Sequence, residues 1–139
     1  MIGRLVAILV LVAASPPAWS RDADLIVVTR GANSTVFGSC VPSLTALNRS
    51  GLSVDYIQVD LEFRLRDGRT ERQEFKSSYR YGAPRPISPD ASRALVIHAD
   101  ESQPMKAACS DIVAIRVVDA ICETDGKPCP TPISVQVAR

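Results

Sequence analysis

The four cysteines are the residues of this chain whose type and spacing are best suited to chemistry. They are Cys40, Cys109, Cys122 and Cys129. Thiols form disulfides, bind metals or perform redox reactions, but the chain has no C-x-x-C motif and a single histidine, which argues against the last two roles. If Asp125-Gly126 forms a two-residue type I′ turn, Cys122 lies opposite Cys129, about 5 Å away between Cα atoms. We therefore expect a Cys122–Cys129 disulfide, which leaves Cys40 to pair with Cys109.

His98 is the only histidine and the next candidate for chemistry. A catalytic role would pair it with Asp100 or a serine, yet the chain has no G-x-S-x-G motif. A copper site would combine it with Met105 and a cysteine, at a spacing that matches no blue-copper ligand loop. In the stretch LVIHAD the imidazole alternates with apolar residues, which predicts a surface position on a strand. A metal or redox accessory role for His98 is kept as an alternative.

Acidic side chains gather near the expected Asp125-Gly126 turn. Asp119, Glu123 and Asp125 could hold Ca²⁺ weakly, but the alternating acidic loop of calcium sites is absent, so we interpret them as a solvated tip. No nucleophile–base pair and no complete metal-ligand set is recognisable. The sequence therefore predicts a protein that is not an enzyme and that uses no cofactor.

Basic residues are concentrated between Arg64 and Arg93, where eight basic and four acidic residues occur. Alternation along a hairpin would bring several of them to one wet face, with two tyrosines nearby. The candidate partner-binding residues are Arg64, Arg72, Lys76, Tyr79, Arg80, Tyr81 and Arg85. The competing interpretation is an ordinary solvated sheet face, because acidic residues are interleaved among the basic ones.

The first twenty residues have the pattern of a secretory signal peptide. Arg4 precedes an apolar run from Leu5 to Ala14, and Ala18-Trp19-Ser20 supplies small residues for cleavage. The run is shorter than the roughly 20 apolar residues that span a bilayer, so we expect no stable membrane insertion after cleavage. The pattern predicts a signal peptide over 1–20, a single domain over 21–139, and a secreted or periplasmic protein in which disulfides persist.

The remainder of the chain is dominated by strand signals. The clearest lies at Val54–Arg66, where five apolar residues alternate with polar ones and predict one buried face. Asp67-Gly68 marks the following turn, and a three-residue loop brings Phe75 onto the buried face, whereas a two-residue loop would not. The strands expected from the sequence are Asp24–Arg30, Ser34–Val41, Val54–Arg66, Thr70–Tyr81, Arg93–Ala99, Ile112–Cys122 and Thr131–Ala138.

About seven strands with regular turn signals predict an all-β fold, an antiparallel β-sandwich. The pattern resembles the architecture of immunoglobulin and fibronectin domains. The Cys…Trp…Cys signature of antibody domains is absent, since the only tryptophan is Trp19. In this fold Ser34–Val41 would be one strand with Gly38 at a bend, and Ile112–Cys122 would be a central strand.

The function predicted from these features is that of an exported, non-enzymatic binding or accessory module. Its partner would be a protein or an anionic ligand, met by an edge strand or by the segments Gly82–Pro89 and Asp100–Ser110. The near-balance of 16 basic and 15 acidic residues argues against nucleic acid as the partner. The alternative is an inhibitor of a secreted hydrolase that inserts the Glu123–Pro128 tip of the 122–129 hairpin.

Two sequons, Asn33-Ser34-Thr35 and Asn48-Arg49-Ser50, fit the pattern for N-glycosylation. They matter only in a eukaryotic source, and the sequence alone leaves open whether either asparagine is modified.

Overall fold

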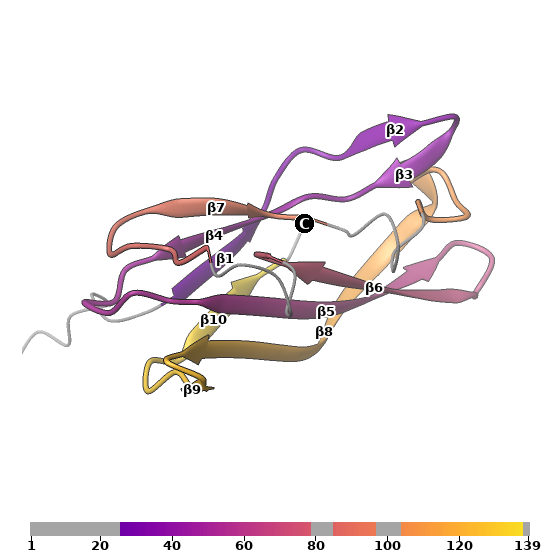
Figure 1. Ribbon diagram of the computed structural model, residues 1–139. Coiled ribbons are helices and arrows are strands. Elements are labelled where there is room, and N and C mark those ends of the chain that lie inside the picture. The colour runs from indigo at the N-terminus through magenta and orange to yellow at the C-terminus, as the bar shows by residue number, and fades with distance from the viewer. Residues whose placement is uncertain (1–25, 79–84, 97–103, 138–139) are drawn as a thin grey trace, which may run out of the picture.

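The fold is all-β in the computed structural model, which describes residues 26–78, 85–96 and 104–137 (Figure 1). These residues contain ten strands and one short 3₁₀ helix, η2 (Cys109–Asp111). Within the same ranges, no helix has the length and apolar character needed to cross a membrane. The predicted signal peptide at 1–20 lies outside the described residues.

One four-stranded sheet has the order β10-β1-β4-β7 and is mixed rather than antiparallel. Its strands are β1 (Ile26–Arg30), β4 (Leu44–Asn48), β7 (Ser92–Leu95) and β10 (Ile133–Gln136). β4 is antiparallel to both β1 and β7, but β10 runs parallel to β1. The expected antiparallel pairing therefore holds for the strand pairs of the described residues except β1 with β10. Pro130 and Pro132, which lack an amide proton for a ladder, separate β10 from the preceding hairpin.

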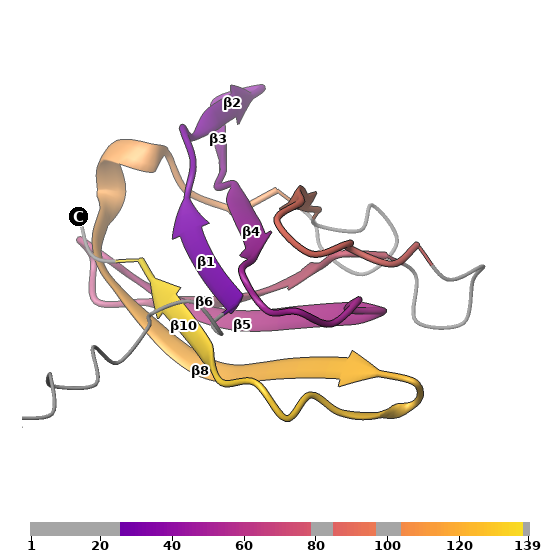
Figure 2. The ribbon, with the colours of Figure 1, turned by 90° about the vertical axis from the view of Figure 1, so that its left-hand side faces the viewer.

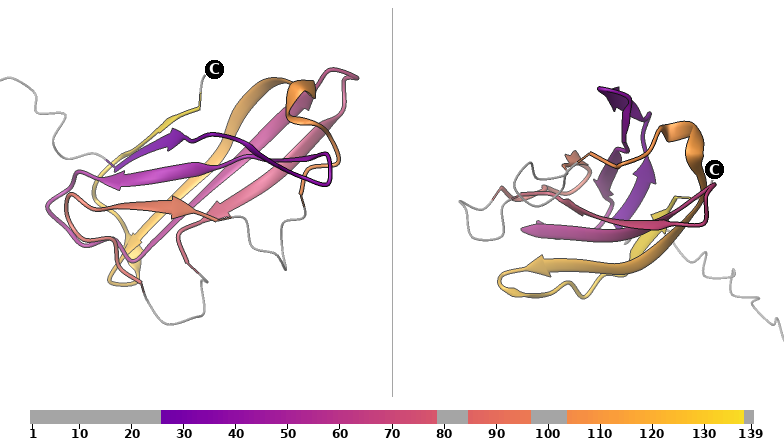
Figure 3. Two further views of the ribbon diagram at one scale, coloured as in Figure 1. Left: turned by 90° about the horizontal axis from the view of Figure 1, so that it is seen from above. Right: turned by 90° about the vertical axis from the view of Figure 1, so that its right-hand side faces the viewer.

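The second four-stranded sheet has the order β6-β5-β8-β9 and is antiparallel throughout. Its strands are β5 (Tyr56–Leu65), β6 (Thr70–Lys76), β8 (Ile112–Thr124) and β9 (Lys127–Pro128). Seen from above, its long strands cross the strands of the first sheet obliquely (Figure 3). A separate two-stranded hairpin consists of β2 (Ser34–Val36) and β3 (Ser39–Val41).

The alternation along β5 confirms the predicted buried face. Ile57, Val59, Leu61, Phe63 and Leu65 are all buried. The β5–β6 turn also has the predicted odd length: Leu65 N donates to Arg69 O at 2.8 Å, which leaves three residues in the loop. Phe75 consequently lies opposite Val59 and is fully buried. A slip of one residue would have turned Phe75 toward solvent.

Both large sheets contribute to one hydrophobic core, including Ile26, Val28 and Leu44 from the first and the apolar face of β5 from the second. Met105 is also fully buried. Asn48 is a buried polar member of this region. Its Nδ2 donates to the carbonyls of Leu52 and Ile87 at 2.7 and 2.9 Å, and its Oδ1 accepts from Ser50.

Three expectations about individual strands are corrected by the structure. Ser34–Val41 is not one bent strand but a hairpin, because Phe37 and Gly38 both have positive φ angles, 48° and 81°. Leu44–Asn48 is a strand that the sequence analysis missed. Ile112–Cys122 is not central: β8 has β5 on one side, but on the other it pairs only with the two-residue β9.

Both predicted disulfides are formed. Cys40 and Cys109 have Cα atoms 4.7 Å apart, and those of Cys122 and Cys129 are 5.3 Å apart. The predicted register of the last hairpin is confirmed as well, with Glu123 opposite Pro128 and Thr124 opposite Lys127. The two bonds fit an extracellular or periplasmic location, where thiols are oxidised.

Candidate functional site

The two large sheets are joined along one side of the molecule and open along the other. On the joined side, Lys76 of β6 and Val96, which follows β7, exchange two backbone hydrogen bonds of 3.0 and 2.9 Å. On the other side β8 and β10 lie near each other (Figure 2), but no strand pairing connects them within the described ranges. In the described part of the chain, no backbone ladder therefore closes the two sheets between β8 and β10.

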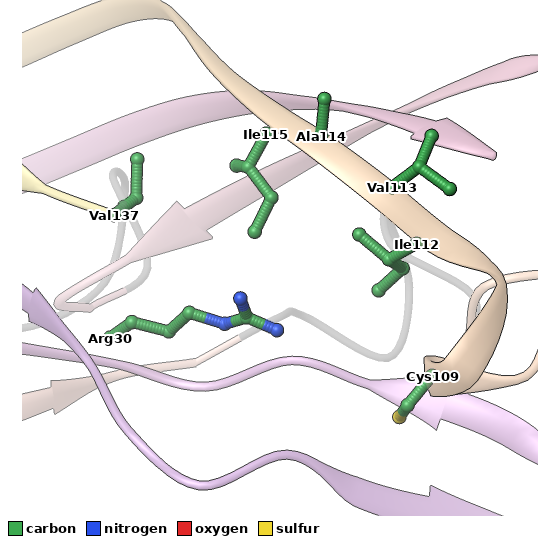
Figure 4. Close-up of a pocket in the computed structure, with 7 residues that line it drawn as sticks. All are labelled: Arg30, Cys109, Ile112, Val113, Ala114, Ile115 and Val137. Carbon is green, nitrogen blue, oxygen red and sulfur yellow. The ribbon is translucent and has the colours of Figure 1, made fainter. Parts of the chain in front are cut away.

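A cavity of about 270 Å³ lies at this open side, near the start of β8. Its apolar wall includes Ile112 and Ile115 of β8 and Val137, which follows β10. Cys109 closes one end and Arg30, the last residue of β1, lies across from the isoleucines (Figure 4). Three separate segments of the chain, around Arg30, Cys109–Ile115 and Val137, thus form this one pocket.

A β-bulge in β8 directs both isoleucines into the pocket. Arg64 of β5 lies opposite Ala114, whereas the next residue, Leu65, lies opposite Ile112, so Val113 is the extra residue. Without the bulge, Ile112 and Ile115 would point to opposite faces of the sheet, since they are three positions apart. With it, both point toward Arg30 while Ala114 points away (Figure 4).

Arg30 is the cationic group of the pocket. Its Nη2 donates to Asn33 Oδ1 at 3.2 Å, which positions the guanidinium and leaves other N–H groups available. Among the described residues, no carboxylate forms an ion pair with Arg30. The pocket therefore combines apolar walls with one positive charge.

The β2–β3 hairpin projects from the body of the protein at the same end (Figures 1 and 2). Phe37 occupies the first position of its two-residue turn, with a φ of 48° and a fully exposed side chain. Val36 is 44% exposed. The whole stretch 31–43 contains no charged residue. The hairpin thus presents an uncharged surface with an aromatic ring at its tip.

The base of this hairpin is firmly held. Cys40 N donates to Ala107 O at 2.7 Å, and Met105 N donates to Cys40 O at 3.1 Å, so the segment before η2 pairs with β3. The Cys40–Cys109 disulfide adds a covalent link at the same place. Because Cys109 also lines the pocket, the hairpin and the pocket are neighbours. Sequence reasoning missed both the hairpin and the pocket. A signal for the hairpin was present, because Phe37 and Gly38 separate two short runs of polar and β-branched residues.

Two of the four basic candidates of the predicted surface that the structure describes, Arg72 and Lys76, form ion pairs. Arg64, Arg72 and Lys76 share one face of β5 and β6, as expected from the register, but Lys76 is buried, so its predicted place on an exposed surface is wrong. Arg72 Nη2 lies 2.8 Å from Asp60 Oδ2, and Lys76 Nζ lies 3.3 Å from Glu74 Oε2. The hydrogen bond to Asp60 raises the pKa of Arg72 above its usual value.

The other members of the predicted surface do not extend it. Arg85 is exposed on the segment that leads to β7. Tyr79, Arg80 and Tyr81 lie outside the described residues. The structure therefore brings three of the seven candidates together and places them among acids.

The 122–129 hairpin is held close to the body of the protein. Asp125 N donates to Asp55 Oδ2 and Thr124 Oγ1 donates to Ser53 O, both at 2.7 Å. These bonds tie the tip to the segment between β4 and β5. Of the two predicted contact segments, Gly82–Pro89 is described from Arg85 onward and Asp100–Ser110 from Pro104 onward.

The chemistry considered for His98 cannot be placed, since His98 and Asp100 lie outside the described residues. Met105, the other proposed copper ligand, has no exposed surface. Within the described ranges, no three acidic, histidine or cysteine side chains lie together as a metal site would require, and this includes Asp119, Glu123 and Asp125. Of the two sequons, Asn33 is exposed, whereas Asn48 is buried and fully hydrogen-bonded, so a glycan cannot reach it in the folded protein.

Comparisons with known proteins add information on the fold alone. No protein-family model and no curated protein matches the chain. A solved structure described as IrmA from Escherichia coli is similar, with a TM-score of 0.52 and 10% sequence identity. The similarity covers 81% of this chain and 91% of IrmA. It supports the all-β architecture over most of the length of both proteins.

Proposed function

We propose that this chain is an exported, non-enzymatic binding module that contacts a protein partner through its β2–β3 hairpin. Export is supported by the signal-like pattern of residues 1–20 and by the two disulfides. The finer architecture we infer is a β-sandwich of the immunoglobulin or fibronectin kind. Two sheets that share one core support it, as does the oblique crossing of their strands.

The observation that carries this proposal is Phe37. A type I′ turn favours asparagine or aspartate at its first position, because these residues tolerate positive φ better than a bulky side chain does. Phe37 has this strained backbone and also exposes its whole ring to water. Neither property stabilises the fold, so burial of the ring in a partner supplies a reason for phenylalanine at this position.

The surroundings of Phe37 indicate what kind of partner surface it fits. Val36 is next to it and partly exposed, and no charged residue lies in the stretch 31–43. An uncharged hairpin with an aromatic tip fits an apolar depression on a protein rather than a charged surface. The disulfide at the base limits the entropy that the hairpin would lose on binding.

The test is site-specific photocrosslinking in the exported fraction of the producing organism. A photoreactive amino acid in place of Thr35, on the exposed β2 strand, should crosslink one protein, and the same group in place of Lys127 should not. Phe37→Asn should abolish the crosslink by removing the ring. Leu52→Asn should preserve it, since Leu52 is a comparably exposed apolar residue, 46% exposed, beyond the opposite end of β4.

Crosslinking that is unchanged by Phe37→Asn would refute the proposal. If the crosslink is lost, calorimetric titration with the purified partner should show at least a tenfold weaker affinity for Phe37→Asn than for Leu52→Asn.

A further inference from the structure

We infer that the pocket between β8 and β10 binds the free C-terminus of an extended peptide whose last side chain is apolar. The site is separate from the Phe37 hairpin, and the inference does not depend on the proposed function. It follows from three observations on the described residues: a positive charge that forms no ion pair among them, an apolar cavity beside it, and a strand edge that no described strand covers.

The positive charge is that of Arg30. A guanidinium can hold a carboxylate through two parallel N–H···O bonds, and a terminal carboxylate is a ligand of matching shape and charge. Asn33 accepts one N–H of Arg30, and the Arg30 side chain extends across the pocket (Figure 4). The described residues provide no carboxylate that would compete for it.

The cavity next to Arg30 determines which side chain the residue with the carboxylate can have. Ile112, Ile115 and Val137 form an apolar wall, and the volume is about 270 Å³. One leucine-sized or phenylalanine-sized side chain fits such a space, whereas a long acyl chain would extend out of it. The bulge at Val113 creates this wall, and bulges are often found where a strand must re-aim side chains at a binding site.

The open edge of β8 favours a peptide over a small amphiphile. Between Ala114 and Ile121 no described strand pairs with the outer edge of β8, because β9 begins to pair only at Glu123. An extended peptide can add to such an edge through backbone hydrogen bonds. With its carboxylate at Arg30, near the start of β8, the peptide would run antiparallel to β8.

The half-exposed apolar residues beside this edge support the same occupant. Val117 of β8 and Ile133 and Val135 of β10 pack against the core but remain partly exposed. A strand added to β8 would lie beneath β10 and cover them. Burial of this apolar area adds to the backbone pairing.

The experiment is a titration of ¹⁵N-labelled mature protein with a synthetic hexapeptide of alternating threonine and valine that ends in leucine. The free acid should shift the amide signals of Arg30, Val137 and the 114–121 stretch, and it should slow hydrogen exchange along that stretch. The same peptide with a C-terminal amide should bind at least tenfold more weakly. Octanoate tests whether a carboxylate with an apolar tail is sufficient.

Two variants and one control isolate the contributions. Arg30→Gln should remove the preference for the acid over the amide, whereas Arg49→Gln, a change at an exposed arginine that follows β4, should preserve it. Ile112→Phe should fill the cavity and weaken both peptides, and its melting temperature shows whether the protein still folds.

Three results would overturn the inference. They are equal binding of acid and amide to the unaltered protein, octanoate binding at least as tightly as the peptide, and signal changes at 114–121 that depend on protein concentration without any ligand, which would reveal a second copy of the chain at that edge.

Discussion

The two disulfide-linked hairpins of this protein use the same turn for different purposes. Phe37-Gly38 joins β2 to β3 with φ angles of 48° and 81°, and Asp125-Gly126 joins β8 to β9 with 51° and 69°. In both, a glycine occupies the second left-handed position. They differ at the first position, which is a fully exposed phenylalanine in one hairpin and an aspartate in the other.

The two turns also differ in how they contact the rest of the protein. The Asp125 turn is bonded to the body of the protein through Asp55, and its aspartate is a residue that tolerates positive φ. The Phe37 turn projects from the body of the protein (Figure 2), and its side chain is fully exposed, so no packing against the described residues offsets the strain. The comparison teaches that the first residue of the β8–β9 turn suits its backbone and its surroundings, whereas the first residue of the β2–β3 turn does not.

The largest expected difference between the hairpins concerns their disulfides. Cys40 and Cys109 are separated by 69 residues in sequence, and Cys122 and Cys129 by 7. In the chain-entropy model, the double alanine variant of the first pair should lose about 4 kcal/mol of unfolding free energy, against about 2.5 kcal/mol for the second. Urea denaturation of both variants measures this. Equal losses would show that loop length does not decide the contributions.

Alanine at the two turn glycines should destabilise both hairpins alike. At Gly38 and Gly126 a new Cβ would meet no atom within 4 Å, so the cost is that of the left-handed backbone alone, about 1 kcal/mol each. Gly51 is the control, because it has the same open space without a positive φ, and Gly51→Ala should not destabilise. Thermal melts compare the three. A much larger loss at one turn glycine would mean that the turns are not equivalent.

Substitutions at the first turn position should change the free energy of unfolding in opposite directions in the two hairpins. Phe37→Asn should raise the unfolding free energy by about 0.5–1 kcal/mol, because asparagine suits the turn. Asp125→Phe should lower it by a similar amount. Urea titrations at one temperature give both values. If Phe37→Asn destabilises the protein, Phe37 belongs to the fold and the comparison above fails.

The smallest expected effect concerns the contact between Asp55 and the second turn. Asp55→Ala removes the acceptor for Asp125 N and should cost about 0.5 kcal/mol, since the bond is exposed to solvent. Faster hydrogen exchange at the Asp125 amide, with unchanged exchange at Gly38, would show that the contact with Asp55 holds the second turn and has no effect on the first. Unchanged exchange at both would show that Asp55 does not hold the tip.

Local patterns in the sequence predicted the second sheet well. The alternation along Val54–Arg66 identified the buried face of β5. The requirement that Phe75 be buried on the same face gave the length of the β5–β6 loop. Asp125-Gly126 gave the register of the last hairpin and its disulfide. Each of these depends on residues within about 20 positions of one another, where turn chemistry and the two-residue period of a strand determine the outcome.

Prediction failed where the sequence signal was weak or the partner was distant. The first hairpin was not predicted because Phe37 is at its turn, and a bulky residue is uncommon at positive φ. β4 includes Thr45, Ala46 and Asn48, so its alternation carries little hydrophobic contrast, although its inward side chains are buried. The parallel pairing of β10 with β1 joins residues more than a hundred positions apart, and nothing in either segment specifies the other.

The sequence by itself determined the all-β class, the two disulfide pairs and the buried face of β5, because local periodicity and elimination among four cysteines suffice for them. Only the tertiary structure decided the mixed sheet, the open edge of β8 and the pocket that Arg30 shares with Ile112 and Val137. The pocket is assembled from β1, η2, β8 and the end of β10, and a bulge sets the direction of its isoleucines. Such an arrangement depends on long-range packing, for which a single sequence contains no local signal.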